Sequence, residues 1–338
     1  MGRRLLLICL ALLAALAVFG GLFLVELHQP YQSDGGGEET ETFVTIPPGA
    51  GARDAAERLR AGGALHTRLP FILWLRYRNA DRAIKAGEYR FTGADSPIDV
   101  ADRITRGDTY YRAITIPEGL TAEETVGLLA RNGFGDIERL QESLTRTEWV
   151  RDIAPAARDL EGFLFPQTYR FGHLDDEDEV VHAMVRQFRE QMDAIAARTP
   201  LPDGWTVSRV VTLASLIEKE AKASEERALV SSVLVNRLDR NIALGCDATI
   251  IYAMKLAGTW DGNIRKSDLQ MPSSYNSYIH RGLPPGPICN PGAASIEAAL
   301  APARTDYLYY VSKNDGTHQF SRTLGEHNAA VNRYQRRR

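Results

Sequence analysis

An uninterrupted apolar segment near the N-terminus constrains this chain more than any other feature of its sequence. Residues 5–25, LLLICLALLAALAVFGGLFLV, contain no charged side chain. At about 1.5 Å per residue, a helix of that length spans roughly 30 Å, the thickness of the hydrocarbon core of a bilayer. The segment therefore predicts a transmembrane helix.

The residues that flank this segment set its expected orientation. Arg3 and Arg4 precede it and Glu26 follows it, so the positive-inside rule places the N-terminus in the cytoplasm. A cleaved signal peptide is the alternative. We favour an uncleaved anchor over 1–27, because the apolar run is long for a signal peptide and no A-x-A cleavage site ends it. The rest of the chain is then exported.

Composition excludes several classes for the exported part. Of 338 residues, 44% are hydrophobic and 25% are charged, which is typical of a folded protein. The net charge of −3 gives no support to a nucleic-acid-binding protein. The 3 cysteines exclude a disulfide-rich scaffold and a four-cysteine metal site. The histidines are scattered, with no HExxH or CxxC motif, so we expect no metal and no cofactor.

Two similar stretches indicate a duplicated small α/β unit after a polar, glycine-rich linker over 28–42. The sequence VTIP at 44–47, with a glycine at 49, returns as ITIP at 114–117, with a glycine at 119. Each copy predicts a strand, a turn and a helix, the helices lying over 52–61 and 122–131.

The region 43–110 carries further predicted elements: a helix over 69–77, a strand over 87–91 and a helix over 98–105. The order strand–helix–helix–strand is that of small glycan-binding modules of LysM type, so we expect a LysM-like subdomain here. This expectation rests on the order of elements alone.

The region 111–338 is predicted to be a mainly helical domain, which makes the whole chain α+β. A proline-rich loop over 258–292 and a short hairpin interrupt its helices; a loop of that length is unusual in a compact domain unless it is functional. The predicted helices cover 138–144, 177–197, 206–221, 225–239, 248–255 and 326–336, and the hairpin strands cover 307–312 and 318–321.

Two glutamates near the end of the predicted helix 206–221 are candidates for catalysis. Glu218 falls at the edge of a largely apolar surface, where desolvation raises the pKa of a carboxyl group and suits it to act as a general acid. Glu220 lies about 160° away around the helix axis, so the two carboxylates cannot face one site. The alternative for Glu218 is a structural ion pair with Lys222 one turn later.

The proline-rich loop holds a second candidate cluster. Tyr275 and Asn276 offer a stacking face and an amide, groups that suit a sugar site, and the glycines and prolines that follow allow a rigid, close approach to a ligand. A purely structural loop is the alternative.

Several segments of the chain resemble the YceG-like endolytic murein transglycosylases, and with the N-terminal anchor the resemblance covers essentially the whole chain. The segments, in chain order, are KAGEYRF (85–91), EGFLFPQTYRF (161–171), LASLIEKEA (213–221), SSVLVNRL (231–238), DATIIYAM (247–254), SYNSYIHRGLPPGPICNPG (274–292), AALAPARTDYLYYV (298–311) and GTHQFSRTLGEHN (316–328). One departure is Ala248, where family members often have proline.

The resemblance implies a membrane-anchored enzyme that faces the cell wall and cuts the β-1,4 bond between N-acetylmuramic acid and N-acetylglucosamine inside nascent glycan strands. The product ends in a 1,6-anhydromuramoyl unit, and we expect the reaction to limit strand elongation. The partners are peptidoglycan strands and, as candidates, peptidoglycan synthases. The implied location is the cytoplasmic membrane, crossed once, with the catalytic domain outside or in the periplasm.

The resemblance assigns the catalytic role to the first acidic residue of the EKE motif, Glu218. This carboxyl would first protonate the glycosidic oxygen and then act as base on the muramoyl C6 hydroxyl, so neither an enzyme nucleophile nor a metal is needed. Tyr275 and Asn276 would position the sugar, and Asp247 and Thr249 would line the cleft. On this reading Glu218→Gln abolishes activity, whereas replacing the second glutamate of the motif has far less effect.

Other interpretations stay open. A non-enzymatic, membrane-anchored peptidoglycan-binding scaffold fits the anchor and the LysM-like order. A Ser/His/Asp hydrolase has little support, because no GxSxG motif occurs. Cys246 and Cys289 flank two of the matched segments, and a disulfide between them is a further hypothesis for an oxidising compartment.

Overall fold

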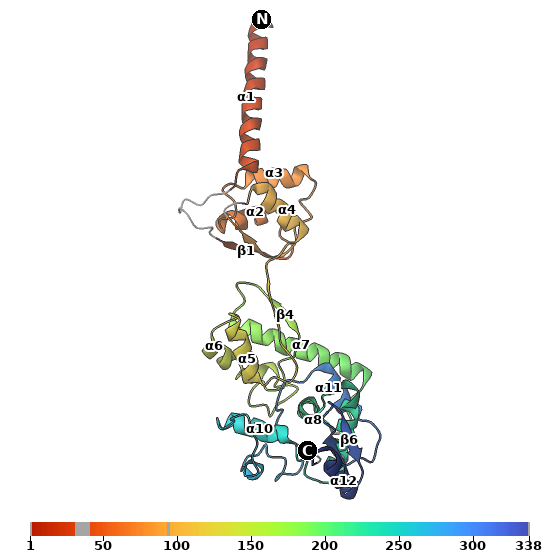
Figure 1. The fold of residues 1–338 in the computed structure, drawn as a ribbon. Helices are drawn as coiled ribbons and strands as arrows, with labels where there is room; N and C mark the ends of the chain where they lie inside the picture. The colour runs from red at the N-terminus through yellow and green to blue at the C-terminus, as the bar shows by residue number, and fades with distance from the viewer. Residues whose placement is uncertain (1, 31–40, 93–94, 337–338) are drawn as a thin grey trace. The chain divides into compact units, whose positions relative to one another are not determined.

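A single long helix, α1 (Gly2–His28), begins the chain (Figure 1). The computed structural model describes residues 2–30, 41–92 and 95–336. Over Leu6–His28, α1 is long and apolar enough to cross a membrane. The expected linker over 28–42 falls mostly on residues 31–40, which lie outside the described residues.

The chain divides into two compact units. The first comprises residues 1–112 together with 170–174, and the second comprises residues 113–169 and 175–338. The return of 170–174 to the first unit is a feature that the sequence did not indicate.

The first unit has the predicted order strand, helix, helix, strand, helix. Its strands pair antiparallel, with Thr42 opposite Phe91 and Ile46 opposite Gly87. The core is formed by apolar side chains that alternate along the strands and recur on the inner faces of the helices, Tyr89 and Phe71 being the largest. The elements are β1 (Thr42–Ile46), α2 (Ala52–Ala61), α3 (Leu69–Tyr77), β2 (Gly87–Phe91) and α4 (Pro97–Arg106).

The second unit is mainly helical, with two short strand pairs. The antiparallel pair near the C-terminus sets Tyr309 opposite Ser321, as the predicted hairpin requires. The helices are α5 (Ala122–Arg131), α6 (Ile137–Ser143), α7 (Glu177–Arg198), α8 (Val207–Glu220), α9 (Arg227–Asp239), α10 (Asp247–Leu256), α11 (Ala293–Leu300) and α12 (Leu324–Tyr334), with 3-10 turns η1 (Thr147–Trp149), η2 (Ser224–Glu226) and η3 (Asp268–Gln270). The strands are β3 (Arg112–Thr115), paired with β4 (Thr168–Phe171), whose last two residues are counted with the first unit, and β5 (Tyr309–Ser312), paired with β6 (His318–Ser321).

Helix α8 lies at the centre of the second unit. It packs against α9, α10 and α11, and every residue from Val210 to Ile217 is buried. The Thr206 hydroxyl caps its first turn by accepting a hydrogen bond from the backbone N–H of Arg209 at 3.2 Å. A buried helix that ends in two glutamates therefore presents both carboxylates where the packed core meets its edge.

Among the described α-helices and strands, two were not predicted. Helix α11 follows the Asn-Pro-Gly sequence at 290–292 and has only 8 residues, too few to display a helical period in the sequence. Strand β4 has 4 residues. The long loop over 258–292 is confirmed, since its only regular element among the described residues is the short turn η3.

Candidate active site

The two glutamates at the end of α8 have separate sets of neighbours, as their angular separation predicts. The Glu218 side chain is 7% exposed, and its Oε2 accepts a hydrogen bond from the backbone N–H of Gly292 at 3.0 Å. Its Oε1 lies 3.6 Å from the Arg227 guanidinium. Glu218 thus connects the end of α8 to the backbone of the proline-rich loop and to the start of α9.

The cation beside Glu218 is Arg227 from the start of α9, not Lys222 as the alternative reading supposed. The Lys222 side chain is exposed, whereas that of Arg227 is only 13% exposed. Arg227 also lies 3.6 Å from a second carboxylate, that of Glu118. Burial and the charge of Glu218 raise the pKa of Glu118, and Arg227 opposes that rise.

Glu118 comes from the turn of the second VTIP-like copy, and sequence reasoning missed it. The first copy has Pro48 at the equivalent position, and in both copies the following glycine adopts a positive φ, +81° at Gly49 and +79° at Gly119. A comparison of the two copies could have identified Glu118 in the sequence, because a carboxylate replaces proline in an otherwise similar turn.

The same turn is fastened to the proline-rich loop. Gly119 donates its backbone N–H to the carbonyl of Asn290 at 2.9 Å, and Asn290 donates back to Leu120 at 2.8 Å. A side chain at Gly292 would come within 1.9 Å of the Glu118 carboxylate. The turn that carries Glu118 therefore packs closely against this loop, while the Glu118 side chain remains 47% exposed.

Glu220 has a different environment. It is partly buried, and its Oε2 accepts a hydrogen bond from the Tyr310 hydroxyl at 3.0 Å. Burial raises the pKa of Glu220, the bond from Tyr310 lowers it, and the nearby Asp247 carboxylate raises it; the net shift is upward. A carboxyl group that stays protonated at a pH above its usual pKa can donate a proton as a general acid.

The neighbours of Glu220 come from distant parts of the chain. Tyr278 donates its hydroxyl to Asp247 at 2.5 Å, and the charges of His318 and Arg237 also act on Glu220. Each of six segments that were singled out in the sequence, from 213–221 to 316–328, contributes one of these residues: Glu220, Arg237, Asp247, Tyr278, Tyr310 and His318.

Hydrogen bonds hold two of these neighbours, His318 and Arg237, in place. His318 lies 2.7 Å through Nδ1 from the carboxylate of Glu226, to which it also donates its backbone N–H. Arg237 donates to the carbonyls of Leu244 at 2.8 Å and Leu308 at 2.6 Å. His318 therefore makes structural hydrogen bonds to Glu226. Within the described residues, no three histidine, cysteine or acidic side chains lie close enough to hold a metal ion.

The four remaining predicted site residues are divided between the surface and the core. Asp247 is exposed beside Tyr278, which is 38% exposed. Thr249 and Asn276 are fully buried. The Thr249 hydroxyl donates to the Cys246 carbonyl at 2.7 Å, and the Asn276 amide donates to the carbonyl of Met271 at 2.9 Å. Both hydrogen bonds go to backbone carbonyls within the fold, so they stabilise the start of α10 and the proline-rich loop.

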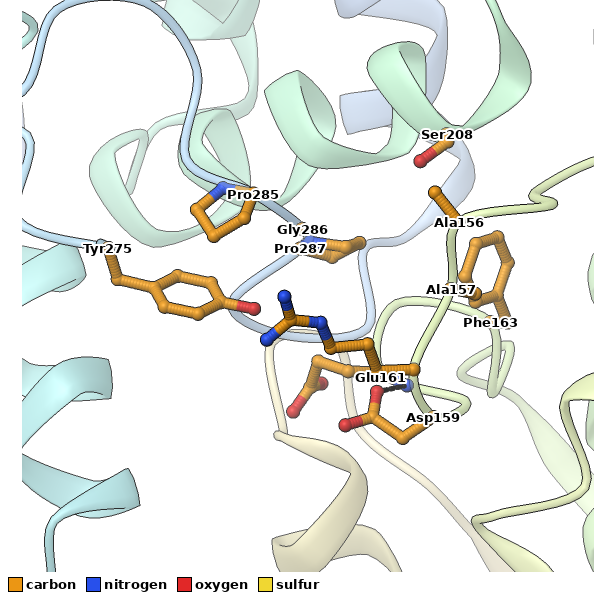
Figure 2. A pocket seen from close by; sticks show the side chains of 11 residues that line it. Ala156, Ala157, Asp159, Glu161, Phe163, Ser208, Tyr275, Pro285, Gly286 and Pro287 are labelled. Carbon is orange, nitrogen blue, oxygen red and sulfur yellow. Dashed lines mark hydrogen bonds between the residues drawn. The ribbon is translucent and has the colours of Figure 1, made fainter. Parts of the chain in front are cut away.

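Tyr275 lines a separate cavity of about 60 Å³ (Figure 2). Its ring points towards the cavity from one side, beneath Pro285, while Asp159 and Glu161 lie across from it. The cavity is too small for a sugar ring, and Tyr275 packs against Tyr252 with ring centroids 4.9 Å apart. We found no contact that joins Tyr275 to either α8 glutamate among the described residues.

Glu161 at this cavity is a buried acid with an unusual pKa. Its side chain accepts the backbone N–H of Ala122, the first residue of α5, at 3.0 Å. Burial raises the pKa of Glu161 from 4.5 to about 8, the main opposing influence being that hydrogen bond. Glu161 is therefore largely protonated in the folded protein at neutral pH.

This shift predicts a pH-dependent stability. Because the pKa of Glu161 is higher in the folded state, its contribution to stability is present below pH 4.5 and is lost as pH rises towards about 8. The loss amounts to at most about 5 kcal/mol. We expect Glu161→Gln to flatten the fall in unfolding free energy between pH 5 and pH 8, as measured by urea unfolding. An unchanged difference between the two pH values would show that Glu161 titrates normally.

The hypothesis of a disulfide between Cys246 and Cys289 is wrong. Both are free and buried, and burial raises the pKa of each thiol. The Cys289 sulfur contacts the carbonyl of Ser215 at 3.4 Å, and the Cys246 sulfur faces that of Leu244 at 3.9 Å. Each therefore acts as a small core residue.

Comparison with known proteins gives consistent matches over most of the chain. Residues 44–333 match the YceG-like family. The chain is 30% identical to the endolytic murein transglycosylase of Bacillus subtilis, over 94% of this chain and 91% of that protein. It is 28% identical to the endolytic murein transglycosylase of Streptococcus pneumoniae, covering 90% of this chain but only 60% of that longer protein.

A solved structure matches as well. The crystal structure of a YceG-like protein from Listeria monocytogenes superposes with a TM-score of 0.56 at 28% identity, covering 86% of this chain and 98% of that one.

Proposed function

The chain belongs to the YceG-like family, and on that premise we propose that it is an endolytic murein transglycosylase. The enzyme cleaves the β-1,4 bond between N-acetylmuramic acid and N-acetylglucosamine within nascent glycan strands, leaves a 1,6-anhydromuramoyl end and so limits strand elongation. One observation carries the proposal: six separate segments converge on a partly buried carboxyl, Glu220, whose pKa is raised.

We assign the catalytic acid to Glu220 in place of Glu218. Both Glu218 oxygens already have partners in the folded protein, the backbone N–H of Gly292 and the Arg227 guanidinium. Glu220 combines a raised pKa with an exposed neighbour, Asp247, on the same surface. The family resemblance assigns the role to Glu218, whereas the raised pKa of Glu220 and its convergent neighbours support our proposal of the second glutamate of the same EKE motif.

The reaction needs one carboxyl group used twice. Protonated Glu220 donates its proton to the glycosidic oxygen as the bond from that oxygen to the muramoyl C1 breaks. The muramoyl C6 hydroxyl then attacks C1, and the Glu220 carboxylate accepts the hydroxyl proton. The attacking group belongs to the substrate, so proximity favours ring closure, and no water is consumed.

The neighbours of Glu220 have matching roles. The Tyr310 hydroxyl stabilises the carboxylate that exists between the two proton transfers. The Asp247 carboxylate keeps the proton on Glu220 beforehand and favours the positive charge that develops at C1. Tyr278 holds Asp247 in place and offers an exposed ring to the sugar. We assign structural roles to Thr249 and Asn276, and Tyr275 lines the separate cavity.

These roles predict opposite pH shifts from two substitutions. Cleavage requires protonated Glu220, so the rate falls as pH rises through the pKa of that group. Asp247→Asn removes a charge that raises this pKa, and the alkaline limb should move to lower pH. Tyr310→Phe removes a hydrogen bond that lowers it, and the limb should move to higher pH. Each shift should be on the order of one pH unit, seen in rate–pH profiles.

A matched control is Tyr307→Phe. Tyr307 lies in the same C-terminal segment but packs against Phe320 with ring centroids 5.7 Å apart. Its pH profile should equal that of the unaltered protein. Shifts in the same direction for Asp247→Asn and Tyr310→Phe would contradict the assignment of Glu220.

Mass spectrometry of products from un-crosslinked glycan strands tests the proposed function. A transglycosylase yields internal fragments whose new ends are one water lighter than those of a hydrolase. The alternative, a non-enzymatic peptidoglycan-binding scaffold, binds the strands and yields no fragments. The first unit has the strand–helix–helix–strand order of a LysM-like module, which fits either function.

The proposed location follows from α1. We propose that this helix crosses the cytoplasmic membrane once and that the catalytic unit lies outside it, in the compartment where glycan strands are made. Peptidoglycan synthases are candidate partners there, because they supply the nascent strands.

A further inference from the structure

Helix α3 in the first unit exposes an apolar face. Leu69, Leu73 and Tyr77 follow one another at intervals of four residues and are 56%, 38% and 77% exposed. Residues so spaced lie on one side of a helix. The opposite side, with Phe71 and Leu75, is buried in the core of the unit. Folding of the unit therefore leaves this face uncovered.

The end of α1 lies beside this helix. Figure 1 shows α3 lying across the C-terminal end of α1, and the two helices are in contact. Thr67, two residues before α3, donates its hydroxyl to the Glu26 carboxylate at 2.6 Å. Leu27 is 2% exposed, unlike the apolar side chains before it in α1. If α1 spans a bilayer, Glu26 marks the level of its outer surface, and α3 starts at that level.

A basic cavity of about 570 Å³ opens at the same corner. Arg53, Arg60 and Arg68 line it, together with Thr67 and Leu69. Two carboxylates contact its described lining residues: Glu57 pairs with Arg60, at 2.8 Å, and with Arg68, and Glu26 accepts the Thr67 hydroxyl. Three guanidinium groups against two carboxylates leave a positive charge next to the exposed apolar face.

Apolar side chains beside arginines form the pattern of a helix that lies in a membrane interface. We propose that α3 and the arginine cavity dock the first unit on the outer surface of the membrane that α1 crosses. The face of Leu69, Leu73 and Tyr77 enters the lipid boundary, and the cavity receives the phosphate of an anionic phospholipid. This inference rests on the proposed membrane anchor.

Spin labels on the full chain in nanodiscs test the docking. Cys9→Ala leaves only Cys246 and Cys289, which are buried and do not react. Single labels are then placed at Tyr77→Cys in α3, Thr45→Cys in β1 and Leu16→Cys in α1. We expect the label at 77 to lie about 5–10 Å within the interface, accessible to oxygen and protected from an aqueous nickel complex. The label at 45 should show the reverse.

The label at 16 distinguishes failure of the docking from failure of the membrane anchor. If the label at 16 is embedded in lipid while the label at 77 is in water, the docking of α3 is refuted and the anchor stands. If both labels are in water, the anchor and the docking are both refuted.

Lipid composition tests the arginine cavity. In nanodiscs that contain phosphatidylglycerol, the label at 77 should lie deeper than in purely zwitterionic ones. The double substitution Arg53→Gln and Arg68→Gln should abolish this difference. Arg58→Gln is the matched control, because Arg58 pairs with Asp54 on the same helix and does not line the cavity. A difference that survives the double substitution would contradict the role given to the cavity.

Discussion

Glu220→Gln is expected to lower the rate of strand cleavage by about 10²- to 10⁴-fold, the usual contribution of a positioned general acid. Glutamine keeps the shape of the side chain, and its carbonyl oxygen can still accept the Tyr310 hydroxyl. It has no acidic proton for the glycosidic oxygen, so only the chemical step should suffer. Strand binding and unfolding free energy should stay close to those of the unaltered protein.

Single-turnover cleavage measures the rate of the chemical step, and co-sedimentation with un-crosslinked strands measures strand binding separately. Lys222→Gln serves as control, because Lys222 is an exposed residue just beyond the same helix. Cleavage by Glu220→Gln at the rate of this control would contradict the catalytic role. A loss of binding equal to the loss of rate would indicate a disturbed fold.

Arg227→Leu is expected to destabilise the second unit by about 3–5 kcal/mol, because it removes one partner of a largely buried ion pair. Glu218, 7% exposed, would be left without its cation and beside the like charge of Glu118. Denaturant unfolding of the full chain measures the effect as a lower midpoint for the second unit.

A second variant identifies the cause of that loss. Glu218→Gln added to Arg227→Leu removes the unpaired charge and should restore part of the lost stability. If the single substitution proves as stable as the unaltered protein, or if the added change restores nothing, then the ion pair does not hold α8 to α9.

Local structure was largely predictable, because its causes lie close together in the sequence. Thr121 and Glu124 have the spacing of a capping box in the sequence, and at the start of α5 each side chain bonds to the backbone of the other. The helical wheel of α8 correctly separated Glu218 from Glu220. The apolar segment 5–25 and the element order of the first unit appear as expected.

The neighbours of the two glutamates were not predictable from the same wheel. The sequence indicated an apolar surface around Glu218, whereas the structure adds Arg227 and the backbone of Gly292 from other segments. The partner of Glu220, Tyr310, lies 90 residues further along the chain. Long-range partners decide a pKa, and a helical period contains no information about them.

The orientation of side chains in the proline-rich loop was also not predictable from the sequence. Asn276 has the chemistry of a sugar ligand, but a turn in the loop directs its amide to the carbonyls of Leu269 and Met271. Tyr278, two residues later, faces outward towards Asp247 instead. Composition identified the loop; its backbone path determines which of its polar groups reach the surface.

The assignment of Glu220 as the catalytic acid is tested most directly by counting the 1,6-anhydro ends that the Glu218→Gln and Glu220→Gln variants form from the same un-crosslinked glycan strands. The two changes are chemically identical and lie two residues apart on one helix. We predict that anhydro ends still form with Glu218→Gln, once its fold has been verified, and that they disappear with Glu220→Gln. Anhydro ends from Glu220→Gln and none from folded Glu218→Gln would contradict the account.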